Sequence, residues 1–233
     1  MWNLVQSSPS GNAAWPFSAS FSQAVTKGNV LVVWGTTPSD SAGNVYTLIT
    51  TRSDGYGNTI SLYYAIVNRT TTITFTSVYI AMEFSGLEVN PLDVISNYLA
   101  AGLSSGTLIG GNVGGAQTYT GIPKWPTELV VNFMQDSNAG GSNVSDYNTP
   151  LGTTKICEIT YTNAGYIVDR WVIFLSTINS DTVSQLDVNW SSALPAPTHI
   201  LGIFASFIVS VKPTGPLQVI MGRLPELPLE KES

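Results

Sequence analysis

The residue types that carry most enzyme chemistry are scarce in this chain. It has one histidine, His199, and one cysteine, Cys157. A Ser-His-Asp triad needs a serine held in a sharp turn beside the histidine, whereas His199 precedes an apolar run and is interpreted as structural. Cys157 lies in the strand-like run 155–161 and is interpreted as a buried small hydrophobe, with a reactive thiol as the alternative. One His and one Cys do not form a typical zinc site without several carboxylates.

Acidic residues are the next candidates for chemistry. Glycoside hydrolysis needs two carboxyl groups that face each other across a cleft. Five carboxylates lie in or near strand-like runs, namely Glu83, Glu88, Glu128, Glu158 and Asp169. Any two of them could in principle pair, but sequence spacing does not establish a pair across a sandwich, so we assign no catalytic residue. We expect a protein that is not an enzyme, and a hydrolase is the least favoured alternative.

Oxygen-rich segments at 136–146, 40–44 and 54–58 could bind calcium, the only cofactor that the sequence suggests, and the first is the main candidate. Calcium takes several oxygen ligands from loops. Asp136, Asn138 and Asp146 are the candidate ligands, and Ser142 and Asn143 lie between them. The segment does not match an EF-hand, and turn formation is the alternative explanation for its composition.

Three aromatic residues in turn-like sequences could stack on sugars. Tyr56 lies between two glycines, Trp125 lies between Lys124 and Pro126, and Tyr147 follows the oxygen-rich segment. A ring offers a large contact area at low entropic cost. These residues are candidate glycan contacts, and Trp125 could equally cover the end of a core.

The elements that must position these residues are short β-rich runs separated by turns. The runs are 29–36, 46–51, 60–66, 71–75, 79–84, 129–134, 156–161, 167–175, 185–190 and 199–211. Several alternate between apolar and polar residues, as in a strand with one wet face. Ten or more short strands with frequent turns predict an all-β fold, a single antiparallel β-sandwich of jelly-roll type spanning residues 1–211.

The C-terminal 22 residues, 212–233, differ from the rest. A break at 212–216 precedes a further strand-like run, and the Pro-punctuated end suits neither a helix nor a central strand. We expect an extended arm that contacts a neighbouring subunit, with packing on its own domain as the alternative. Its candidate contact residues are Leu217, Val219, Met221, Leu224, Leu227 and Leu229.

Charge and hydropathy exclude some partners. Charged residues make up 10% of the chain, the net charge is −6, and no two of the nine Lys and Arg are adjacent. A phosphate backbone requires clustered cations, so we exclude nucleic acid. The longest apolar run, 200–211, is shorter than the roughly 20 residues of a membrane helix, so no membrane span is expected. The N-terminus lacks the features of a signal peptide.

Seven segments together resemble a known group of modules. They are 25–33, 41–47, 63–68, 71–75, 82–86, 91–93 and 127–131. In this order they are similar to a loose family of β-sandwich modules from phage and archaeal virus structural proteins and bacterial surface proteins. The resemblance covers residues 1 to about 211. It implies a lectin-like or jelly-roll sandwich used for display or attachment, without a catalytic motif that maps onto this chain.

These observations favour a virion structural protein, such as a capsid, turret, decoration or appendage subunit. Its partners would be other copies of itself or other virion proteins, and it would be located in the virion. Two alternatives are a module that binds surface glycans, and a secreted pilus or filament subunit at the cell surface.

Overall fold

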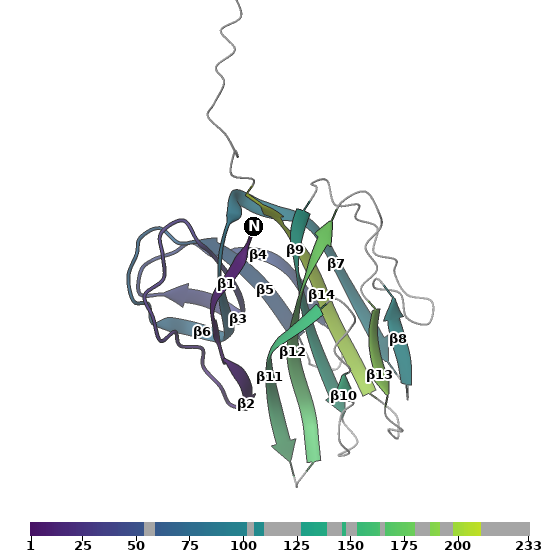
Figure 1. Ribbon diagram of the computed structural model, residues 1–233. Helices are drawn as coiled ribbons and strands as arrows, with labels where there is room; N and C mark the ends of the chain where they lie inside the picture. The colour runs from purple at the N-terminus through teal and green to yellow at the C-terminus, as the bar shows by residue number, and fades with distance from the viewer. Residues whose placement is uncertain are drawn as a thin grey trace, which may run out of the picture.

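The computed structural model describes residues 1–53, 59–101, 105–109, 127–138, 146–147, 153–163, 166–179, 187–191 and 198–210. Within these ranges all regular secondary structure is β-strand, which confirms the all-β prediction (Figure 1). Since the described residues form no helix, none of them provides an apolar helix of membrane-spanning length. The strands are β1 (Asn3–Ser8), β2 (Gly11–Ala14), β3 (Val30–Asp40), β4 (Thr47–Ser53), β5 (Thr59–Ile66), β6 (Phe75–Ser85), β7 (Leu87–Ala101), β8 (Ser105–Ile109), β9 (Thr127–Asn138), β10 (Asp146–Tyr147), β11 (Thr153–Asn163), β12 (Tyr166–Asn179), β13 (Asp187–Ser191) and β14 (Thr198–Val209).

The strands form three sheets. A five-stranded sheet has the order β1-β6-β3-β5-β4, and a six-stranded sheet has the order β2-β11-β12-β9-β14-β7. A three-stranded sheet, β10-β13-β8, is drawn beyond the six-stranded sheet in Figure 1. All described strand pairs are antiparallel except the short parallel pair of β2 and β11.

The main core lies between the five-stranded and the six-stranded sheet. Alternate residues of β3, among them Val30, Val32 and Trp34, meet alternate residues of β9, among them Leu129 and Val131. The period of two sends every second side chain of a strand to the same face, so each sheet contributes one apolar face to this core. The two sheets therefore pack face to face, as in a sandwich.

The outward faces of both sheets are also covered. On the five-stranded sheet, Leu31, Val33 and Ala81 pack with Val25 and Ile73, which belong to segments that cross this face. Isolated bridges between Val25 and Thr71 and between Ser20 and Thr74 tie those segments together. Burial on both faces explains why β3 begins with a continuous apolar run.

The chain passes between the sheets at Gly86. β6 ends one residue before it in the five-stranded sheet, and β7 begins one residue after it in the six-stranded sheet. Gly86 has a φ of +79°, and a Cβ there would collide with the backbone carbonyl oxygen of Met1. Only glycine fits this crossing without strain.

Two sequence predictions about strands are corrected. Residues 71–74, expected to begin a strand, form only the isolated bridges, and the strand begins at Phe75. The strand predicted at 129–134 is longer, because β9 extends through Asp136 to Asn138. The segment after Ser210 lies outside the described residues, so the predicted C-terminal arm stays a prediction.

Candidate functional site

Several predicted site residues lie outside the described residues. These are Tyr56, Trp125 and the six arm residues Leu217, Val219, Met221, Leu224, Leu227 and Leu229. Tyr147 and Asp146 form β10, whose backbone pairs with that of Trp190 and Ser191. Asp136 and Asn138 lie in strand β9 rather than in a loop, in a different sheet from Asp146. The side chains of these four residues are not among the described ones.

The turn at 40–44 also carries several side-chain oxygens, and hydrogen bonds from neighbouring residues occupy its carboxylate. The Asp40 carboxylate accepts hydrogen bonds from the backbone amides of Ala42 and Asn44, from Asn44 Nδ2 and from the Tyr46 hydroxyl, at 2.7–3.3 Å. Burial, helped by the hydrogen bond to Asp40 and its negative charge, raises the pKa of Tyr46 far above its usual value. Four donors stabilise this carboxylate without a metal ion.

Three of the carboxylates considered for catalysis, Glu83, Glu88 and Glu158, lie in different surroundings. Glu83 is buried in the five-stranded sheet, and Glu88 is exposed on β7. Glu158 is bracketed by Lys155 at 3.0 Å and Arg170 at 3.1 Å. Among the described residues, no group of three or more His, Cys, Asp or Glu side chains could hold a metal ion.

One serine motif was missed by the sequence reasoning. Residues 102–106 read Gly-Leu-Ser-Ser-Gly, which has the Gly-x-Ser-x-Gly spacing. In esterases that spacing forms a turn from a strand into a helix. Here β7 ends at Ala101 and β8 begins at Ser105, so the motif connects two strands, and 102–104 lie outside the described residues. The backbone of His199 pairs with Ala101, but the described side chains form no triad.

Cys157 matches its structural interpretation. It lies on β11 within the core between the two sheets and is 1% exposed. Burial, with a smaller contribution from the charge of Glu158, raises the pKa of the Cys157 thiol to about 12. The thiol is therefore protonated and inaccessible at neutral pH.

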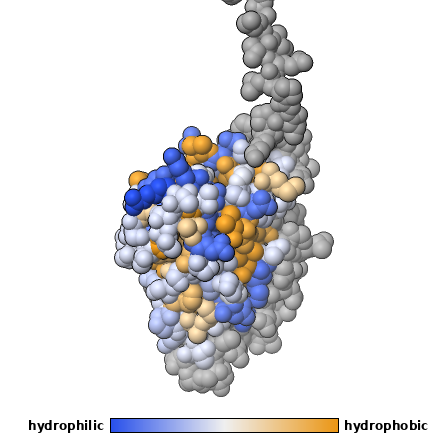
Figure 2. Space-filling view, turned by 60° about the vertical axis from the view of Figure 1, so that its left-hand side comes forward, coloured by the Kyte–Doolittle hydropathy of each residue, from blue (hydrophilic) through white to orange (hydrophobic). Residues whose placement is uncertain are grey.

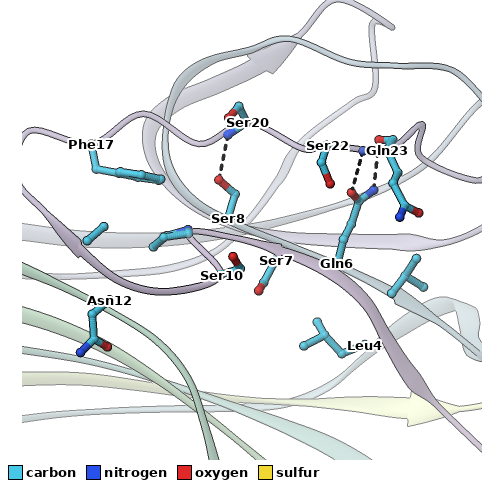
Figure 3. Close-up of a pocket in the computed structure, with 13 residues that line it drawn as sticks. Leu4, Gln6, Ser7, Ser8, Ser10, Asn12, Phe17, Ser20, Ser22 and Gln23 are labelled. Carbon is cyan, nitrogen blue, oxygen red and sulfur yellow. Dashed lines mark hydrogen bonds between the residues drawn. The ribbon is translucent and has the colours of Figure 1, made fainter.

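A groove of about 650 Å³ lies beside the N-terminal strands. Its walls are β1, the start of β2, and the 17–23 segment that crosses the outward face of the five-stranded sheet (Figure 3). Eight of its lining residues carry a hydroxyl or an amide, and they are Gln6, Ser7, Ser8, Ser10, Asn12, Ser20, Ser22 and Gln23. The other described lining residues are apolar, and none of the described lining side chains is charged.

Hydrogen bonds hold the two walls of the groove together. Gln6 Nε2 donates to the Gln23 carbonyl oxygen, and Gln6 Oε1 accepts from the Gln23 amide, both at 3.3 Å. The Ser20 amide donates to Ser8 Oγ at 2.9 Å (Figure 3). Behind the groove, the buried Glu83 accepts a 2.6 Å hydrogen bond from Gln6 Nε2. Gln6 is thus fixed from two directions.

A second feature is the position of the exposed apolar side chains. The large hydrophobic residues that are exposed in the described structure are Met1, Val5, Val45, Leu48, Val89, Ile95 and Tyr161. Each lies on an edge strand (β1, β4 or β7), within two residues of one, or, for Tyr161, on β11 just beyond its pairing with the edge strand β2. On the face in Figure 2 the hydrophobic groups form separate patches among hydrophilic ones.

The edge strands gather on two opposite sides of the sandwich. β1 and β4 are the two edges of the five-stranded sheet, and β2 and β7 are the two edges of the six-stranded sheet. β4 contacts β7, whereas β1 contacts β11, the neighbour of β2. We call these the β4/β7 side and the β1/β2 side. Sequence reasoning missed both because β1, β2 and β7 were not predicted.

Comparison with known proteins adds no relative. No family model, no curated protein and no solved structure matches this chain at a significant level.

Proposed function

We propose that this chain is a non-catalytic structural subunit of a virion, which joins its neighbours through the edges of its sheets. The observation that carries the proposal is that the exposed large apolar side chains of the described structure lie on or beside edge strands. The charge-poor composition and the resemblance to virion β-sandwich modules support the same conclusion.

Edge strands are natural contact sites between subunits. A strand at the edge of a sheet presents backbone donors and acceptors that a strand of another chain can pair with. Soluble proteins usually protect such edges with charged residues, especially lysine. Here the β4/β7 side carries Leu48, which is 49% exposed, and Val89, which is 76% exposed, beside the exposed Glu88. Apolar contact would add to backbone pairing at such an interface.

The two sides favour a head-to-tail assembly. The β1/β2 side and the β4/β7 side are made of different strands at opposite ends of the sheets. If one side docks on the other, the contact is heterologous, and repeating it gives a ring or a continuous array. Shells and appendages are built from contacts of this kind. The expected jelly-roll type and the contact arm at 212–233 belong to the same proposal.

Charge placed on an edge tests the proposal. In sedimentation velocity of the full chain over a wide concentration range, the unaltered protein is expected to self-associate. Leu48→Lys should weaken that association about tenfold or more, because desolvating one unpaired charge costs more than about 1.4 kcal/mol. Thr72→Lys adds the same charge at an exposed position in a segment that crosses the outward face of the five-stranded sheet, and it should change nothing.

Two results would count against the proposal. One is an unaltered protein that stays monomeric at the highest concentration. The other is association that Leu48→Lys and Thr72→Lys weaken equally, because that would reflect net charge rather than a specific edge. Electron microscopy of the concentrated protein separates closed shells or rings, expected for a capsid or turret subunit, from the long filaments expected for an appendage or a pilus.

A further inference from the structure

We infer that the groove between β1 and the 17–23 segment is a binding site for a neutral, polyhydroxylated ligand, namely a surface glycan. The inference is independent of assembly through sheet edges. The described lining of the groove comes from residues 4–23, so the inference rests on other residues than the aromatic ones that the sequence suggested.

The chemistry of the lining selects the ligand class. Hydroxyl and amide groups both donate and accept hydrogen bonds, as sugar hydroxyls do. A phosphate or carboxylate ligand would call for Arg, Lys or a helix N-terminus, and a cation would call for carboxylates. The part of the lining that the structure describes holds no charged side chain. Two carboxylates lie near the lining and both are occupied. Glu83 is buried and accepts hydrogen bonds from Gln6, Thr26 and Asn29. Glu158, which pairs with Asn12 across β2 and β11, is held by Lys155 and Arg170.

The polar groups divide into those that build the groove and those left for a ligand. Gln6 and Ser8 hold the walls together through Gln23 and Ser20. The side chains of Ser10, Asn12 and Ser22 are exposed, and no hydrogen bond joins them to any described residue. In Figure 3, Asn12 and Ser22 lie on different walls, so a ligand between them would meet polar groups from both.

Phe17 supplies an apolar surface at the same site. It lines the groove and is partly buried against the main core, which fixes its position. The C–H face of a sugar ring packs favourably on an aromatic ring. A few placed polar groups around an apolar surface, in a volume of several hundred Å³, is the usual composition of a small-ligand site.

The rigidity of the walls lowers the cost of binding. Hydrogen bonds at Gln6 and at Ser8 cross-link β1 to the 17–23 segment before any ligand arrives. A preformed site avoids the entropy of ordering side chains and loops on binding. The Gln6–Glu83 bond extends this support into the five-stranded sheet.

The test measures sugar binding to the full chain and to groove variants. Saturation-transfer NMR with the methyl glycosides of glucose, galactose, mannose and N-acetylglucosamine detects weak contacts, and an array of neutral and acidic glycans identifies longer ligands. We expect binding to at least one neutral glycan. Asn12→Ala should weaken it about two- to tenfold, the effect of one lost hydrogen bond.

A matched pair of variants locates the site. Ser22→Trp fills the groove and should abolish binding, whereas Ser18→Trp places the same ring at an exposed position that does not line the groove and should leave binding intact. Far-UV circular dichroism and thermal unfolding confirm that both variants are folded.

Three outcomes would overturn the inference. They are no binding to any glycan, binding only to acidic glycans or to extended peptides, and binding that Ser22→Trp leaves unchanged. Binding measured on Leu48→Lys separates the two proposals, because that change lies on the β4/β7 side, away from the groove. Retained glycan binding by a monomeric variant would support the groove whatever the assembly state.

Discussion

Buried polar side chains on the outward faces of the two large sheets differ in their hydrogen bonding. On the five-stranded sheet, Glu83 is fully buried and accepts hydrogen bonds at 2.6–2.8 Å from Gln6 Nε2, the Thr26 amide and Asn29 Nδ2. On the six-stranded sheet, Asn132 is equally buried, yet neither its Oδ1 nor its Nδ2 has a hydrogen-bond partner among the described residues. Glu83 therefore stabilises the fold around it, whereas burial of the Asn132 amide lowers the free energy of unfolding.

The hydrogen bonds of Glu83 support the proposed groove. Glu83 anchors β1 through Gln6 and anchors the loop before β3 through Thr26 and Asn29. One carboxylate therefore supports a wall of the groove and the cover over the outward face. A buried amide without a partner makes no such contribution, since its desolvation is not compensated.

Removal of the Glu83 carboxylate should have the largest effect. Glu83→Ala leaves three donors without their acceptor and should lower the free energy of unfolding by about 3–5 kcal/mol. Glu83→Gln, which keeps one acceptor oxygen, should cost less. Chemical denaturation measures both, and Glu88→Ala, an exposed glutamate on β7, should change stability by less than about 0.5 kcal/mol. Equal losses for Glu83→Ala and Glu88→Ala would contradict the anchoring role.

The interior between the two sheets should show its own pH dependence. Burial raises the pKa of Cys157 to about 12 from an ordinary 9.0. Above pH 9 the unfolded thiol loses its proton while the folded thiol keeps it, so stability falls by up to about 1.4 kcal/mol per pH unit until pH 12. Denaturation of the unaltered protein and of Cys157→Ala between pH 8 and pH 12 isolates this effect. Parallel curves for the two proteins would show that the thiol is not buried in this way.

The smallest effect should have the opposite sign. Asn132→Leu replaces an amide without partners by an apolar side chain of similar size and should raise stability by about 1 kcal/mol. For a chain of this length that is a rise in Tm of roughly 2–4 °C. Asn132→Asp buries a charge and should lower Tm. A loss of stability in Asn132→Leu would mean that the amide is satisfied, and the contrast with Glu83 would disappear.

The sequence predicted the central strands better than the edges. Residues of β3 and β9 are buried on both faces, and this produces the apolar runs that mark such strands. The edge strands β1, β2 and β7 carry serine, asparagine and proline among their apolar residues, and their local pattern is weak. Their positions depend on pairing with distant strands, which local periodicity does not report.

The groove was not predictable from local sequence for a related reason. Its lining consists mainly of serine, glutamine and asparagine, which are frequent throughout the chain and form no motif. The site exists because β1 and the 17–23 segment are bridged by Gln6 and Ser8. A run of hydroxyl and amide residues before the first central strand was the only available signal. Trp15 illustrates the same limit, since it packs against Trp34 and Trp171 from two different sheets.

The central claim is that subunits join through opposite edges, and cross-linking tests it most directly. Val5→Cys on the β1/β2 side and Leu48→Cys on the β4/β7 side, combined in one chain, provide two exposed thiols, while Cys157 stays buried. With a short bis-maleimide, the double variant should give a ladder of covalent oligomers, whereas each single variant should stop at dimers. A double variant that yields only monomers and dimers at concentrations where the protein associates would contradict head-to-tail assembly.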